Sequence, residues 1–260
     1  MTSGKKARQQ RHAPPPPVRS TGARRASPKV LLIAAAAILL VGAAAAAGIA
    51  LTRGSSSSSS PSSTTALPDS AAVLAEFRGI PQQGTRLGSS KAPVELIEYI
   101  DLQCPICRDF ETNVMPTIVR KYVRNGKVQV VARPIAFIGP ESVSGRLAAL
   151  AAAKQNHFFD FSQLVYANQG AENTGWLNDD FVSSAYASIP GLNAQAAADA
   201  RASSTVSSDA QAFDRQATAD KVAGTPSIYV GKRGGPYAFV GPGSPSTQVL
   251  EDAIKNALGQ

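Results

Sequence analysis

Cysteine is almost absent from this sequence of 260 residues, which contains only Cys104 and Cys107. Exported domains that depend on several disulfides carry more cysteines, so a structural disulfide framework is excluded. Histidine is equally rare, with only His12 and His157. A structural zinc site takes four Cys or His ligands. Because a long apolar segment, residues 30–51, separates His12 from the other three residues, we expect no metal site.

Acidic residues are missing from the first 29 residues, which carry eight Lys or Arg residues. The net charge of the whole chain is also +8, so the rest of the protein is close to neutral. The basic excess therefore indicates membrane topology and not a nucleic-acid partner. We expect residues 1–29 to be a basic cytoplasmic tail.

Charged residues and proline are both missing from residues 30–51. A helix of this length spans roughly 33 Å, which is enough for a hydrocarbon core of about 30 Å. The segment predicts a single transmembrane helix or uncleaved signal anchor, with the N-terminus in the cytoplasm and the catalytic domain outside the cell membrane. The alternative is a cleaved signal peptide, because small residues at 43–48 suit a signal peptidase. Either way, the C-terminal part is exported.

The rest of the chain divides into a linker and a folded domain. Residues 52–70 are rich in serine, as expected of a flexible linker, and residues 71–260 form the domain. Apolar periodicity predicts strands at 94–100, 128–136, 227–230 and 237–240. It predicts helices at 70–77, 104–125, 143–154, 158–168, 179–188, 194–219 and 247–258.

The order of these elements predicts the fold class. A strand, a helix and a strand come first, and two strands and a helix come last. Between them, residues from about 141 to 222 contain helices alone. We therefore expect an α/β, thioredoxin-like fold with an all-helical insertion in its middle.

The two cysteines lie where the first predicted strand gives way to a helix. Cys104 occupies the first turn, where free backbone N–H groups and the helix dipole favour a thiolate. Pro105 suits this position because its missing N–H costs nothing there. Cys107, one turn later, is expected to be more buried, to donate to the Cys104 sulfur and to resolve a mixed disulfide. A purely structural disulfide, which is worth only roughly 2 kcal/mol for so short a loop, and a pair of inert thiols are the alternatives.

A second motif, residues 224–226 (Gly-Thr-Pro), immediately precedes the third predicted strand. Proline is tolerated at a strand entry, so this motif alone is an ordinary turn. Beside a cysteine pair, it supports a redox site.

These motifs resemble those of a known family. Residues 98–107, Glu-Tyr-Ile-Asp-Leu-Gln-Cys-Pro-Ile-Cys, together with Gly-Thr-Pro-Ser-Ile-Tyr-Val at 224–230, are similar to the DsbA family of thiol–disulfide oxidoreductases. Its membrane-anchored Gram-positive and actinobacterial members are the most similar, and the resemblance covers about residues 85–258.

The resemblance implies roles for individual residues. Cys104 is the expected nucleophile and Cys107 the resolving thiol. Pro226 is the expected cis-proline facing the disulfide, and Thr225 before it contributes backbone contacts to an extended substrate. Glu98 matches an acidic residue beneath the active site that helps to move protons.

The strand pattern gives an independent argument for a functional Glu98. It shares a strand face with Val94, Leu96 and Ile100, so its carboxyl should be partly buried and its pKa raised. A solvated strand end is the alternative. Asp101 is a weaker candidate for the same work.

The family further implies an oxidase that forms disulfides in exported, cysteine-containing proteins. It needs no cofactor beyond the dithiol, and a quinone-linked membrane partner of the DsbB or VKOR kind reoxidises it. Ile106 departs from the family pattern, because strongly oxidising members have histidine there, so a milder oxidant is expected. A disulfide reductase or isomerase of the same fold, and a redox-sensing or substrate-binding module without turnover, are the alternatives.

Overall fold

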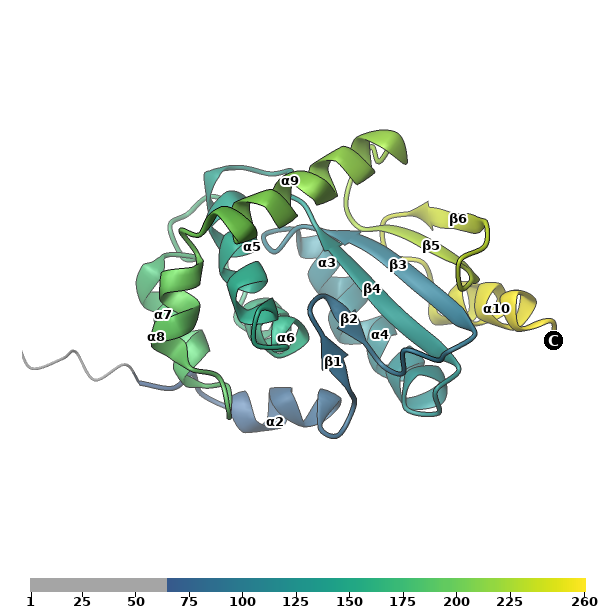
Figure 1. Ribbon diagram of the computed structural model, residues 1–260, viewed down its shortest axis with the longest axis horizontal. Helices are drawn as coiled ribbons and strands as arrows, with labels where there is room; N and C mark the ends of the chain where they lie inside the picture. The colour runs from purple at the N-terminus through teal and green to yellow at the C-terminus, as the bar shows by residue number, and fades with distance from the viewer. Residues whose placement is uncertain (1–64) are drawn as a thin grey trace, which may run out of the picture. The chain divides into compact units, whose positions relative to one another are not determined.

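The computed structural model describes residues 65–260, drawn as ribbons in Figure 1. The predicted cytoplasmic tail, the apolar segment at 30–51 and most of the serine-rich linker lie outside the described residues. Among the helices of residues 65–260, none has the length and apolar character that a membrane span requires.

A six-stranded sheet forms the centre of the fold, in the order β1-β2-β4-β3-β5-β6. β3 (Val94–Ile100) pairs in parallel with β4 (Val128–Pro134) and antiparallel with β5 (Ser227–Lys232). β6 (Tyr237–Pro242) completes this side of the sheet. All seven residues of β3 are buried, because elements cover both faces of this central strand. The four strands predicted from the sequence are confirmed.

A short hairpin adds two strands that the sequence pattern did not predict. β1 (Gln82–Gln83) and β2 (Arg86–Leu87) are two residues each, and β2 pairs antiparallel with β4. Two residues are too few to show the alternation that identifies a strand. Before the hairpin, α2 (Ser70–Leu74) and η1 (Ala75–Phe77) form the predicted N-terminal helix of the domain, and α2 packs against α6.

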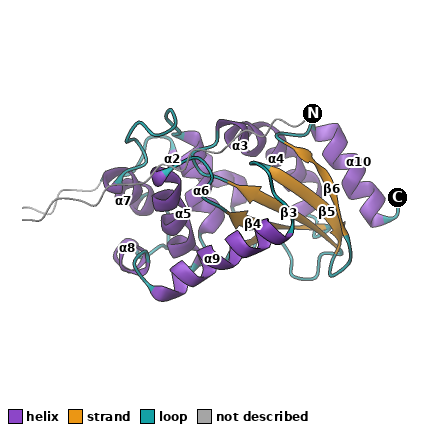
Figure 2. Ribbon diagram, turned by 90° about the horizontal axis from the view of Figure 1, so that it is seen from above, coloured by secondary structure: helices purple, strands orange, loops and turns teal. Residues whose placement is uncertain are grey.

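The two faces of the sheet are covered by different helices. On one face, Leu96 and Ile100 join the main core, together with the helix after β3 and α10 (Thr247–Leu258). On the other face, Ile97 and Tyr99 pack beneath α9. Figure 2 shows α9 running alongside the strands, with α10 at the opposite side.

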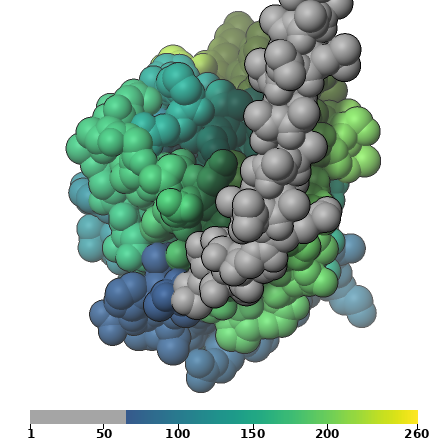
Figure 3. Space-filling view, turned by 90° about the vertical axis from the view of Figure 1, so that its left-hand side faces the viewer, coloured from purple at the N-terminus to yellow at the C-terminus, as the bar shows by residue number. Residues whose placement is uncertain are grey.

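Five helices form the predicted insertion: α5 (Pro140–Ala153), α6 (Phe158–Ala167), α7 (Asp179–Ala187), α8 (Ala194–Ala200) and α9 (Ser204–Ala219). Figure 3 shows this block and the N-terminal segment of the domain sharing one face. The prediction of a single helix over 194–219 was wrong. The chain breaks at residues 201–203, and the Ser203 hydroxyl accepts from the N–H of Val206 to begin α9.

The helix that carries the cysteines is continuous but irregular. It consists of α3 (Pro105–Asp109), a π-helical turn η2 (Phe110–Val114), α4 (Met115–Ile118) and a second π-helical turn η3 (Val119–Val123). Pro116 has no N–H to donate to the carbonyl four residues earlier, which belongs to the first π turn.

Candidate active site

Cys104 is the N-terminal cap of the helix that follows β3. Its backbone is extended, Pro105 begins the helix, and the N–H of Cys107 donates to the Cys104 sulfur over 3.4 Å. Cys104 is buried, with 5% of its surface exposed, Cys107 is completely buried, and both are free thiols. The structure therefore places the pair where the sequence predicted it, with Cys107 deeper than Cys104.

The Gly-Thr-Pro loop faces the cysteines from the start of β5. The peptide bond between Thr225 and Pro226 is cis, the conformation that the resemblance implied. The Cys104 thiol donates to the backbone carbonyl of Thr225 over 3.3 Å. Antiparallel pairing of β3 with β5 brings together these segments, which lie 121 residues apart in the chain.

The two thiols have opposite pKa shifts. A hydrogen bond from the Cys107 side chain, with smaller contributions from Thr225 and backbone N–H groups, outweighs burial and lowers the pKa of Cys104 to about 6. Burial, followed by the hydrogen bond to Cys104, raises the pKa of Cys107 well above its ordinary value. At neutral pH this arrangement gives a thiolate at Cys104 and a thiol at Cys107, as a nucleophile and a resolving residue require.

Two buried carboxyl groups lie on the same side of the sheet as the cysteine helix. Glu98 is completely buried, and its pKa is raised well above the ordinary value, first by burial and then by Glu111. Burial also raises the pKa of Glu111 to about 7. Gln163 on α6 donates to Glu111 over 3.2 Å. The predicted direction for Glu98 is confirmed, and its burial is complete where the sequence predicted partial burial.

Glu111 and Gln163 were missed in the sequence. Glu111 lies four residues after Cys107, on the helix face that includes the apolar residues Phe110 and Val114. A carboxyl at this spacing was a usable signal. Gln163 gave no comparable signal, because only the tertiary packing of α6 brings it to Glu111.

Comparison with known proteins identifies the family. The model of the thioredoxin protein family matches residues 82–235. The probable disulfide bond formation protein D of Bacillus cereus is 31% identical over 147 residues, which cover 55% of this chain and 68% of the relative. The chain belongs to the DsbA-like thiol–disulfide oxidoreductases. A relative with the same description from Bacillus anthracis is 29% identical over the same shares of the two chains.

Comparison with solved structures supports the same fold. The oxidised form of BdbD from Bacillus subtilis superimposes with a TM-score of 0.60 at 20% identity, over 70% of this chain and 98% of that one. A thioredoxin-like oxidoreductase from Silicibacter pomeroyi gives a TM-score of 0.55 at 24% identity, over 75% and 99% of the two chains.

Ile106 lies at the surface of this DsbA-like site. The residue is 48% exposed, which is unusual for a large apolar residue. The loop between β6 and α10 approaches it, since a methyl group added at Gly243 would lie 3.9 Å from Ile106 Cγ2. Ile106 therefore exposes an apolar side chain between the two cysteines of the motif.

Asp101 holds a loop of the DsbA-like domain in place. One carboxylate oxygen accepts from the N–H of Gln103, and the other accepts from the N–H groups of Phe137 and Ile138. Three backbone donors satisfy this buried carboxylate. The contacts therefore indicate a structural role for Asp101, and they fix the loop that follows β4 beside the cysteine turn.

Side-chain amides form hydrogen bonds between the helical insertion and the turn at residues 101–104, which precedes the cysteine helix. Gln103 is completely buried, donates to Ser142 and accepts from the N–H of Asn173. Gln169 donates to the carbonyls of Leu102 and Cys104. Sequence reasoning did not find these residues, because polar side chains in predicted loops and helices are usually solvated.

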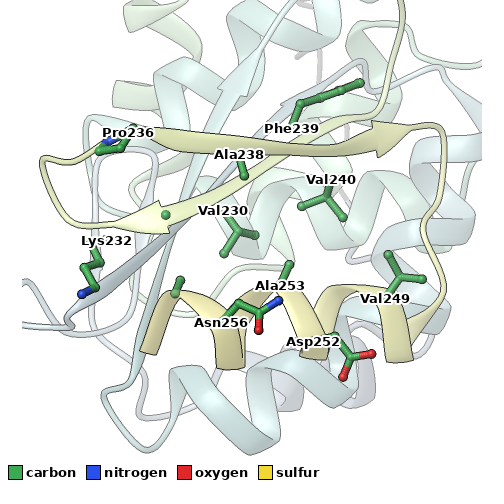
Figure 4. Close-up of a pocket in the computed structure, with 12 residues that line it drawn as sticks. Val230, Lys232, Pro236, Ala238, Phe239, Val240, Val249, Asp252, Ala253 and Asn256 are labelled. Carbon is green, nitrogen blue, oxygen red and sulfur yellow. The ribbon is translucent and has the colours of Figure 1, made fainter. Parts of the chain in front are cut away.

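Two hollows differ in their relation to the cysteines. One of about 620 Å³ lies beside the start of α3, lined by Gln103, Pro105, Arg108 and the insertion loop at 169–172. A more apolar one of about 570 Å³ lies between β6 and α10, as Figure 4 shows, and its lining includes neither cysteine. The lining of the first hollow does not include a cysteine either, but it includes Gln103 and Pro105, the two chain neighbours of Cys104.

Proposed function

We propose that this DsbA-like oxidoreductase is an oxidase that forms disulfides in exported proteins through Cys104 and Cys107. The observation that carries the proposal is the set of hydrogen bonds at the Cys104 sulfur, which lowers the pKa of this thiol to about 6. A stabilised thiolate stabilises the reduced form of the pair, which makes its disulfide oxidising. The relatives are named disulfide bond formation proteins, which supports the same direction.

The proposed cycle moves two electrons from a substrate dithiol to the protein. A substrate thiolate attacks the Cys104 sulfur of the disulfide, and Cys107 leaves as a thiolate that takes up a proton. The second substrate thiolate then attacks the substrate sulfur of the mixed disulfide, and Cys104 leaves. Its low pKa makes Cys104 the better leaving group in this second step.

The proposed substrate site includes the loop with the cis-proline. The Thr225 carbonyl lies 3.3 Å from the Cys104 sulfur, so an extended substrate bonded to that sulfur passes along Thr225 and Pro226. In this proposal, Thr225 contributes backbone hydrogen bonds, and Pro226 presents a face without an N–H donor. Ile106 adds an exposed apolar surface for unfolded chains.

The remaining parts of the proposal concern partners and location. The dithiol is the redox group, so no organic cofactor or metal is required. Reoxidation requires an electron acceptor, for which a quinone-linked membrane protein of the DsbB or VKOR kind is the family's solution. Residues 30–51 would anchor the protein in the membrane with its catalytic domain outside the cytoplasm.

A reductase or isomerase is the second candidate. Ile106 favours it, because strongly oxidising members of the family have histidine at this position. For scale, the pKa of the reactive cysteine is about 3.5 in the strongly oxidising DsbA and about 7 in thioredoxin. The value of about 6 for Cys104 lies between them. A redox-sensing or substrate-binding module is the third candidate. It would have the same arrangement of Cys104, Cys107 and the cis-proline but would not turn over a substrate.

Turnover separates these candidates. The oxidised full-length protein, mixed with a reduced, unfolded substrate and a disulfide oxidant, should form substrate disulfides over many cycles. Cys104→Ala should abolish the activity, and Cys107→Ala should trap a mixed disulfide. Full activity in Cys104→Ala would contradict catalysis by this pair, and reduction of substrate disulfides alone would favour the reductase.

A further inference from the structure

Three of the four carboxyl oxygens of Glu98 and Glu111 are buried without a hydrogen-bond donor from the described residues. Glu98 comes from β3 and Glu111 from η2, and Glu111 is near enough to raise the pKa of Glu98. Within residues 65–260, no group donates to either oxygen of Glu98 or to Oε1 of Glu111. A single proton shared between the two carboxyls supplies the missing donor, because it leaves one carboxyl neutral and the other charged.

Gln163 makes the hydrogen bond that distinguishes the two carboxyls. Its Nε2 donates to Oε2 of Glu111 over 3.2 Å, whereas both oxygens of Glu98 lack such a donor in the described part of the chain. Gln163 is buried and belongs to α6 of the helical insertion, 52 residues after Glu111. A donor held against one carboxyl favours the charged form of that carboxyl.

We propose that Gln163 is a positioning residue: once the pair holds a single proton, Gln163 keeps that proton on Glu98 and leaves Glu111 as the carboxylate. Glu111 follows Cys107 by four residues on one helix, so the two side chains share a face of that helix. Glu111 is then the base available to the Cys107 thiol, and Glu98 is the neutral partner. The inference rests on the cycle of Cys104 and Cys107 proposed above.

The proton moves with the sulfur chemistry. During reoxidation, the Cys107 proton passes to Glu111, the Cys107 sulfur attacks the Cys104 sulfur of the mixed disulfide, and the electron acceptor's sulfur leaves with two electrons. During substrate oxidation, the departing Cys107 thiolate recovers the proton. The other acidic groups facing this cluster are Asp101, held by backbone donors, and Tyr166, whose pKa burial raises well above its ordinary value.

Site-resolved titration of the two carboxyls in the full-length chain tests the proposal. Carbon-13 labels on the glutamate carboxyls report each ionisation by NMR, and Glu98→Gln and Glu111→Gln assign the signals. In the wild-type protein, Glu111 should ionise at lower pH than Glu98. In Gln163→Leu, which removes the donor at similar size, the pKa of Glu111 should rise by about 1 unit. The pH profile for resolution of a mixed disulfide by Cys107 should shift equally.

Ser162→Ala is the matched control. Ser162 is the neighbouring residue on α6, and its buried hydroxyl has no partner among the described residues, so neither carboxyl should change its titration. An unchanged Glu111 titration in Gln163→Leu overturns the proposal. If that variant does not fold, ionisation of Glu98 before Glu111 in the wild-type protein overturns it. Because the titration needs no turnover, it is independent of the oxidase proposal.

Discussion

Cys104 and Cys107 lie one helical turn apart, yet their pKa values shift in opposite directions. Cys104 caps the helix and receives hydrogen bonds from the Cys107 thiol and the Cys107 N–H, so its charged form is favoured. Cys107 is completely buried, so its charged form is disfavoured. Chemically identical side chains thus acquire the two roles of the cycle from position alone.

The Cys104 thiolate should titrate near pH 6. Thiolate absorbance at 240 nm in the reduced protein measures this midpoint directly. In Cys107→Ala, the pKa of Cys104 should rise by about 1–2 units, because the Cys107 thiol contributes the largest stabilising hydrogen bond. Arg108→Ala is the control, since this side chain donates to neither sulfur, and a Cys104 titration that is insensitive to Cys107→Ala would contradict the assignment.

The buried carboxyls should make the folded state less stable as pH rises. Glu111 keeps its proton to about pH 7 in the folded state and has an ordinary pKa of 4.5. The folded state therefore binds more protons between these pH values, and stability falls as pH rises through that window. Glu111→Gln should remove up to about 3 kcal/mol of this loss.

Urea unfolding of the oxidised protein at pH 5 and pH 8 measures that effect. The oxidised form is required because the Cys104 thiolate changes stability in the opposite direction. Glu172→Gln, at an exposed position, is the control and should keep the wild-type dependence. An equal loss of stability in the wild type and in Glu111→Gln would show that Glu111 is not protonated in the folded state.

At the scale of elements, α9 is fixed at both ends by side-chain hydrogen bonds. Ser203 caps its first turn. Beyond its last turn, Asp220 accepts from the Tyr99 hydroxyl over 2.6 Å and pairs with Arg133 over 2.9 Å. These contacts hold the long helix of the insertion across the second face of the sheet.

Ser203→Ala should destabilise the protein by about 1 kcal/mol, because the first turn of α9 loses its cap. Urea unfolding gives the total effect, and amide hydrogen exchange should show faster exchange in the first turn of α9. Ser204→Ala, at the next, exposed position, should change little. Equal effects of the two substitutions would exclude a capping role for Ser203.

The sequence predicted elements well where a single element determines its own pattern. β3 is mainly apolar, with Glu95 and Glu98 as its charged residues, because both faces of the strand are covered, and α10 matches its predicted bounds. The two errors have local causes. The strands β1 and β2 are too short to show a period, and the alanine-rich stretch at 194–219 has high helix propensity on both sides of the Ser203 cap.

The residues of the candidate site also differ in how far the sequence predicted them. Cys104, Cys107 and the Thr225–Pro226 turn were predicted because each belongs to a short motif. The partnership of Glu98 with Glu111 was not predicted, because a helical carboxyl beside apolar residues usually faces solvent. The spacing of Glu111 from Cys107 places it on the apolar face of the helix, but its burial depends on the packing of α6 against the cysteine helix, which the spacing alone does not establish.

At the scale of the whole molecule, the reduced protein should gain stability relative to the oxidised protein as pH rises from about 6 to 8.5. The pKa of Cys104 is about 6 when folded and about 8.5 in an unfolded chain, so the unfolded state binds more protons in this window. Allowing for solvent screening, the gain is about 2 kcal/mol. Urea midpoints of both redox forms at pH 5 and pH 8 measure it, and a constant difference would contradict the stabilised thiolate.

The equilibrium reduction potential of the Cys104–Cys107 pair, measured in the full-length protein against glutathione, tests the central claim most directly. Thioredoxin lies near about −270 mV and the strongly oxidising DsbA near about −120 mV. The account predicts a value between them, clearly more oxidising than thioredoxin, because the Cys104 thiolate stabilises the reduced form. A value at or below that of thioredoxin would contradict the oxidase and favour a reductase that draws electrons from a donor.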